Sequence, residues 1–222
     1  MKKHAINILF CCLVYSLAAQ NAAADLNMVR QSFMNAGQIG FEVEVYHYPT
    51  KNSGGELLSK GVMRKSGDNY YSSFRNDKMI LNKSKGTVII DENYKEVTYF
   101  PPGKSKQEPQ QMSLPDSLFD RFEYAGKVNG LKKYAYRSDD DQAAILKTEL
   151  FINENNQLHK LIYYYNKDSK EVSYNAYKVE ILYKNIMTAN ISKDYFDISD
   201  IISWSNNKVH LTKKYSGYTL LH

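Results

Sequence analysis

The residue types that could carry metal or nucleophilic chemistry are few in this sequence and widely spaced. Beyond the N-terminal segment the histidines are His47, His159, His210 and His222, and no two have the spacing that brings metal ligands together on one helix or hairpin. The run Asp139-Asp140-Asp141 could bind calcium, but it lacks the alternation and the distal glutamate of an EF-hand loop. We therefore predict no metal site, and a solvated acidic loop at the three aspartates.

A catalytic nucleophile is equally hard to place. A G-x-S-x-G turn, the usual signature of a serine nucleophile, is absent, and both cysteines, Cys11 and Cys12, lie in the N-terminal apolar segment. The glycine patterns that bind nucleotide phosphates are absent as well. Paired carboxylates for glycoside hydrolysis stay open, although one tryptophan, Trp204, is few for an enzyme that stacks sugars. We predict a protein that is not an enzyme, with no catalytic residue and no cofactor.

What the sequence offers instead is apolar side chains at alternating positions, which place one face of a strand against a core or a ligand. Residues 38–48 and 174–187 show this alternation most clearly, with glutamates and lysines on the other face. A gap between such a sheet and its helices would fit an apolar ligand, and a fully packed core is the alternative. The candidate ligand-binding residues are Phe41, Val43, Val45, Phe119, Phe122, Tyr177, Val179, Ile181 and Tyr183.

The elements that must position these residues are mostly short strands separated by turn-forming residues at roughly ten-residue spacing. We expect strands at 38–48, 57–64, 69–75, 79–82, 87–91, 96–100, 127–138 (a pair divided at Asn129-Gly130), 145–165 (divided at 153–156) and 174–187. Helical spacing of apolar residues predicts two short helices, at 25–36 and 113–125. The segment 195–204 is rich in apolar residues.

This pattern predicts a mainly β (α+β) fold. We expect a single curved antiparallel sheet that forms an open half-barrel, with short helices packed on its concave face. No linker divides the chain, so residues 25–204 are predicted as one domain, followed at 205–222 by a basic C-terminal tail or a last strand.

The first 24 residues look like a signal peptide. Lys2 and Lys3 precede a short apolar run, and Ala22-Ala23-Ala24 supplies the small residues that signal peptidase requires. We predict cleavage after Ala24, with cleavage after Ala19 as the alternative. Because the run is shorter than the ~20 residues that span a bilayer, the protein is not expected to be membrane-spanning. Export without cysteines in the mature chain indicates the periplasm. The formal net charge of +5 is small and the basic residues are scattered along the chain, which argues against nucleic acid as a partner.

From the first expected helix onward, the order of features resembles the LolA-like superfamily of periplasmic lipoprotein carriers. A glycine-led strand with a basic end, Gly61-Val62-Met63-Arg64-Lys65, is followed by the aromatic strand Tyr70-Tyr71-Ser72-Ser73-Phe74. An apolar strand and a glycine turn come next, at Met79-Ile80-Leu81-Asn82 and Lys85-Gly86. The segments 149–165, 179–186 and 194–198 are similar to the family's closing strands.

Departures from the family pattern occur at the turn, where Lys85 replaces an aspartate and Ile89-Ile90-Asp91 replaces a Trp-x-Tyr motif. The resemblance implies a half-barrel that holds acyl chains of lipids or lipoproteins and carries them toward the outer membrane. The alternative is an envelope interaction, scaffold or sensor protein of the same fold with a filled core. Envelope proteins are possible partners under both hypotheses.

Overall fold

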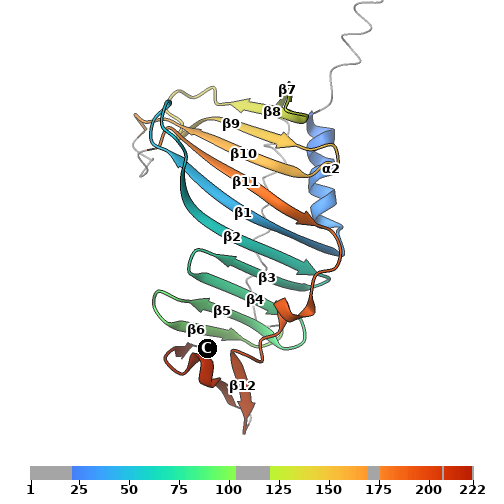
Figure 1. Cartoon of the computed structure of the whole chain (residues 1–222), viewed down its shortest axis with the longest axis vertical. Coiled ribbons are helices and arrows are strands. Elements are labelled where there is room, and N and C mark those ends of the chain that lie inside the picture. Colours follow the sequence, from blue (N-terminus) through green and yellow to red (C-terminus); the bar gives the residue numbers. More distant parts are fainter. Residues whose placement is uncertain (1–21, 104–120, 170–175, 207, 222) are drawn as a thin grey trace, which may run out of the picture. The chain divides into compact units, whose positions relative to one another are not determined.

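A computed structural model of the chain describes residues 22–103, 121–169, 176–206 and 208–221. It divides into two compact units, the first within Met1–Met34 and Ser113–Asn175 and the second within Asn35–Met112 and Ala176–His222. In both units the strands form an open, mostly antiparallel sheet (Figure 1). The predicted fold class, mainly β with little helix, is confirmed.

The described residues of the first unit form one α-helix and four antiparallel strands. Its elements are α2 (Ala22–Met34), β7 (Glu123–Val128), β8 (Leu131–Arg137), β9 (Ile145–Ile152) and β10 (Leu158–Tyr165). The strands are hydrogen-bonded in the order β7-β8-β9-β10. The predicted turn at Asn129-Gly130 joins β7 to β8, and both residues have the positive φ that such a tight turn requires.

The helix expected at 113–125 needs correction at its C-terminal end. Residues 113–120 lie outside the described residues, but Glu123–Ala125 belongs to strand β7. Glu123 pairs with Ala135, and the ring of Tyr124 lies 5.6 Å from that of Tyr134 across the hairpin. Cross-strand pairing therefore outweighs the helical spacing here, and Gly126 lies at an irregularity inside the strand pair.

Helix α2 is anchored to its unit by a buried polar contact as well as by its apolar residues. Leu26 and Val29 are buried, as the helical spacing predicts. Asp25 is also buried, and its carboxylate accepts hydrogen bonds from the hydroxyl of Tyr134 and from Nζ of Lys132, the latter at 3.1 Å. Burial and the neighbouring carboxylate both raise the pKa of Tyr134, so this hydroxyl stays protonated and donates to Asp25.

The described residues of the second unit form the other strands and two short 3-10 helices. Its elements are β1 (Gln38–Tyr48), β2 (Glu56–Ser66), β3 (Asn69–Phe74), β4 (Asp77–Asn82), β5 (Gly86–Asp91), β6 (Glu96–Phe100), β11 (Lys178–Met187), η1 (Lys193–Phe196), β12 (Ile202–Ser205), β13 (Lys208–Leu211), η2 (Lys213–Tyr215) and β14 (Thr219–Leu221). The strand order is β14-β6-β5-β4-β3-β2-β1-β11, with β14 parallel to β6 and the other pairs antiparallel. Strands β12 and β13 form a separate hairpin.

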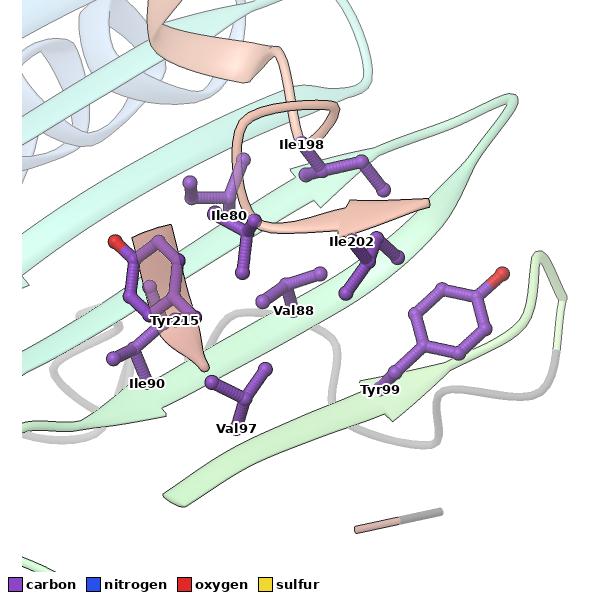
Figure 2. Packing of buried hydrophobic residues seen from close by; sticks show 9 residues of the cluster. Ile80, Val88, Ile90, Val97, Tyr99, Ile198, Ile202 and Tyr215 are labelled. Atoms are coloured by element: carbon purple, nitrogen blue, oxygen red, sulfur yellow. The ribbon is translucent and has the colours of Figure 1, made fainter. Parts of the chain in front are cut away.

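One face of this sheet, which we name the covered face, packs against residues 193–221, the C-terminal segment. On the strands it consists of Ile80, Val88, Ile90, Val97 and Tyr99, all nearly or fully buried. Figure 2 shows Ile198, Ile202 and Tyr215 of the C-terminal segment pointing at these side chains. Together they form the hydrophobic core of the second unit.

A buried arginine extends this packing beyond the apolar cluster. Arg64 is 4% exposed, donates to the carbonyl oxygens of Phe41 and Met63 at 2.8 and 2.7 Å, and lies 5.5 Å from the ring centroid of Tyr195. Its aliphatic part passes so close to Gly40 that a Cβ there would lie 2.6 Å from Cδ of Arg64. Glycine at position 40 thus makes room for the arginine that holds η1 against the sheet.

Candidate ligand-binding face

The other side of the second unit's sheet, which we name the opposite face, carries the apolar residues singled out from β1 and β11. The register pairs Val43 with Tyr183 and Val45 with Ile181, and residues directly opposite each other project to the same side. The rings of Phe41 and Tyr183 lie 5.6 Å apart in an edge-on arrangement. The alternation in the sequence therefore brings the predicted residues of both strands together on one surface.

Burial changes along this surface. Phe41, Val43 and Tyr183 are buried at 4, 8 and 4% exposure. Val45 and Ile181 are half-buried in the part of the chain that the structure describes. The apolar surface thus runs from a packed end toward one that is accessible to a further apolar group.

The remaining predicted site residues are less closely associated with this surface. Val179 pairs with His47 at the end of β11, and Tyr177 precedes the strand, where its N–H donates to the carbonyl of Tyr48 at 2.8 Å. Phe122 belongs to the first unit, is 3% exposed, and has its ring centroid 6.1 Å from that of Tyr136. Phe119 lies outside the described residues. The roles of all nine residues as ligand contacts stay predictions.

Sequence reasoning missed most of the opposite face. Following the register from Phe41 across β2, β3, β4, β5 and β6 leads to Met63, Ser72, Met79, Ile89 and Thr98. The neighbouring row adds Tyr70, Leu81 and Phe100, and all these apolar side chains are half-buried. The signal was present as alternation in each strand, but the strands are short and apolar on both faces, so the pattern does not tell the faces apart.

A glycine shapes the middle of the opposite face. The ring of Phe74 lies over Gly61 of the neighbouring strand, where a Cβ would be 2.5 Å from Cδ2 of the ring. Gly61 itself pairs with Val43. Phe74 is 39% exposed, and the guanidinium of Arg75 lies 5.8 Å from its ring centroid. A partly exposed aromatic ring therefore lies on this face, on the strand next to Gly61.

Two basic residues at the end of β2 differ in where they project. Arg64 lies on the covered face, where it pairs with Tyr71 and contacts Tyr195. Lys65 pairs with Ile39 and Tyr70 and so lies on the opposite face, at the edge of the apolar surface. Of the two basic residues, Lys65 is therefore the one that shares a face with the candidate residues.

The covered-face side of β1 and β11 is polar, which fixes the orientation of these strands. Glu44 accepts hydrogen bonds from Lys184 at 2.5 Å and from the Tyr46 hydroxyl at 2.8 Å, and Lys60 is 3.2 Å away. The hydrogen bond from Lys184, followed by that from Tyr46, lowers the pKa of Glu44 to about 2. A slip of one residue would exchange this ionic cluster for Val43 and Val45, so the register is strongly specified.

Other kinds of site find little support in the described residues. Within the four described ranges, no group of three or more histidine, cysteine, aspartate or glutamate side chains is arranged to hold a metal ion. Likewise, no helix among the residues that the structure describes has the length and apolarity to cross a bilayer.

No established protein-family model and no curated protein matches the sequence. Among solved structures, the chain is similar to a LolA superfamily protein from Nitrosomonas europaea, with 10% identity, coverage of 79% of this chain and 97% of that one, and a TM-score of 0.30. It is also similar to a DUF1329 family protein from Desulfovibrio piger, with 12% identity, coverage of 82% and 98%, and a TM-score of 0.35. The superfamily that the sequence resembles is thus among the structural matches.

Proposed function

We propose that the chain is a periplasmic carrier that holds acyl chains, of lipids or of lipoproteins, on the opposite face of its second unit. The observation that supports this is the apolar surface that continues from Phe41 and Tyr183 to half-exposed side chains on the neighbouring strands. Carriage toward the outer membrane is the role that this binding would serve. The chain would bind and release its ligand without changing it chemically.

An acyl chain suits such a surface because its binding depends on the area that it buries and needs few directional contacts. A ligand of about twelve methylenes would gain on the order of 0.8 kcal/mol per buried methylene before the costs of ordering. Met63 and Met79 lie in the middle of the face, and methionine side chains adapt to ligands of different shape. The gain is sufficient for micromolar binding.

The proposal is tested by titrating a fluorescent fatty acid into the folded protein. We expect saturable binding with a dissociation constant in the micromolar range. A well-folded wild type that binds no probe at about millimolar concentration would contradict the carrier hypothesis. That result would leave the envelope interaction protein with a filled core as the better account.

Two adjacent residues of β11 provide a matched pair of variants. Ile181 lies on the opposite face and Leu182, which pairs with Glu44, lies on the other side of the same strand, and both are half-buried. Ile181→Asn should weaken probe binding by about tenfold, or about 1.4 kcal/mol, whereas Leu182→Asn should leave it near that of the wild type. Equal effects of the two substitutions on probe binding would show that the ligand does not lie on this face.

A further inference from the structure

The hairpin formed by β12 and β13 is amphipathic, and its apolar side extends beyond the part that packs into the core. On one side Ile202 pairs with Leu211 and Trp204 with Val209. On the other side, paired positions carry Ser203, Ser205, Lys208 and His210, all exposed. Ile202, Val209 and Leu211 pack into the core of the second unit. The apolar side of the hairpin therefore continues from the core outward to Trp204.

Only part of the Trp204 side chain is buried by the protein. Its ring meets that of Tyr99 edge-on, with 6.1 Å between centroids, yet the residue remains 47% exposed. Tyr99 itself is 4% exposed, so it is already covered. A tryptophan with one apolar side in water and a polar N–H at its edge is the side chain that favours the boundary between water and hydrocarbon.

The segment that carries this tryptophan is basic. Between Ile201 and Leu221 the sequence contains three lysines, Lys208, Lys213 and Lys214, and no aspartate or glutamate. All three lysines are exposed. The adjoining Asp200 is 3.7 Å from Lys214 and is itself highly exposed, so it offsets one of the three charges. The segment that carries the exposed Trp204 ring therefore has a net positive charge.

We propose that the β12–β13 hairpin is a docking surface for the interface of an anionic lipid bilayer, with Trp204 entering the headgroup region and the three lysines facing lipid phosphates. Tryptophan burial and attraction of lysines to anionic headgroups are the two contributions that hold a peripheral protein on such a membrane. The proposal is separate from acyl-chain binding on the opposite face, because the hairpin packs against the covered face.

The single tryptophan of the sequence makes the test specific to this hairpin. The full chain is mixed with vesicles of phosphatidylcholine containing phosphatidylglycerol, and tryptophan emission is recorded against vesicles of phosphatidylcholine alone. We expect emission to move to shorter wavelength with the anionic vesicles, to be quenched by brominated acyl chains, and to return as salt is added. Unchanged emission at saturating anionic lipid would overturn the proposal.

Two triple variants that remove the same charge distinguish binding by this hairpin from a general effect of net charge. Lys208→Gln/Lys213→Gln/Lys214→Gln should weaken vesicle partitioning by roughly a hundredfold, since each lysine near an anionic surface contributes about fivefold. The control Lys51→Gln/Lys127→Gln/Lys167→Gln removes the same charge from exposed positions outside the C-terminal segment and should leave partitioning within about twofold of its wild-type value. Equal losses in both triples would overturn the proposal.

Trp204→Ala should weaken vesicle partitioning, measured by sedimentation, by roughly tenfold or more, because the exposed half of the ring would no longer be buried in the membrane. If Trp204 only shields Tyr99, the substitution should lower stability in urea and leave partitioning unchanged, which would also overturn the proposal. The fatty-acid probe titration on the same variant distinguishes the two sites. A hairpin variant that no longer binds vesicles but still binds the fatty-acid probe would support separate sites. A wild type that binds vesicles but not the probe would contradict only the carrier hypothesis.

Discussion

The covered and opposite faces of the second unit are built from alternate residues of the same strands, yet they differ sharply in burial. Ile90 is 1% exposed beneath the C-terminal segment, whereas its neighbour Ile89 is half-buried on the other side. The strands β4–β6 are apolar on both sides, which is typical of a sheet that is covered twice. The C-terminal segment covers one side, and on the carrier hypothesis the other side would take the apolar ligand.

The largest expected effect comes from placing the same carboxylate on each face. Ile90→Asp buries a charge without a partner, which should cost roughly 4 kcal/mol or more, or abolish folding. Ile89→Asp leaves its carboxylate partly in water and should cost about 1–2 kcal/mol. Urea unfolding of both variants checks the comparison. Similar losses of unfolding free energy would mean that the two faces are equally covered.

Truncating a buried residue of the C-terminal segment should have the next largest effect on the free energy of unfolding. Ile202 of β12 is 1% exposed in the core of the second unit, and Ile202→Ala should cost about 2–5 kcal/mol through the cavity that it leaves. Calorimetry or urea melts give this value. Val45→Ala on β1, where the side chain is already half-exposed, is the control and should cost less than Ile202→Ala.

Two glycines test the close contacts on the two faces. Gly40→Ala would push into Arg64 and Ile191, both buried, and should cost about 1–3 kcal/mol. Gly61→Ala meets the exposed ring of Phe74, which can rotate away, and also the Ser73 carbonyl at 3.0 Å, so a smaller loss is expected. Urea unfolding should rank Gly40→Ala as the more destabilising, and the reverse order would place the rigid contact on the opposite face.

The smallest expected effect depends on pH. Hydrogen bonds from the side chain and backbone of Ser199, together with that from Lys85, lower the pKa of Asp197 to about 2. Because the folded pKa lies below the ordinary value of 3.8, the contribution to stability is present above pH 3.8 and disappears as the pH falls toward 2. The difference in unfolding free energy between wild type and Asp197→Asn should shrink over that range. A gap that stays constant between pH 6 and pH 2 would contradict this assignment.

Much of the fold was accessible from local sequence, because short-range signals dominate in hairpins. The bounds of β1 and β6 agree with prediction, since alternation and flanking prolines define both strands. The shared face of the candidate residues was predictable only where alternation is strict, as at Phe41, Val43 and Tyr183. In β4–β6 both faces are apolar, so only the packing of the C-terminal segment distinguishes Ile80 from Leu81.

Long-range contacts explain what could not be predicted. Glu123–Ala125 has helical apolar spacing on its N-terminal side, but its partner strand decides its conformation. The parallel strand β14 is three residues long and has no local signature, because its partner residues Glu96–Thr98 lie far away in the sequence. The contact between Trp204 and Tyr99 could not be predicted from local sequence, because the two residues lie far apart in the chain.

The parallel pairing of β14 with β6 also has a kinetic consequence. Leu220 and Val97 are paired although they lie roughly 120 residues apart along the chain, so the meander β2–β6 can form by local hairpins long before its edge is closed. In that interval the nascent sheet exposes Val88 and Val97 to the environment along with an unpaired strand edge, the two features that promote aggregation. Closure of this sheet must therefore await synthesis of the C-terminal segment, and folding should be sensitive to protein concentration until that segment is available.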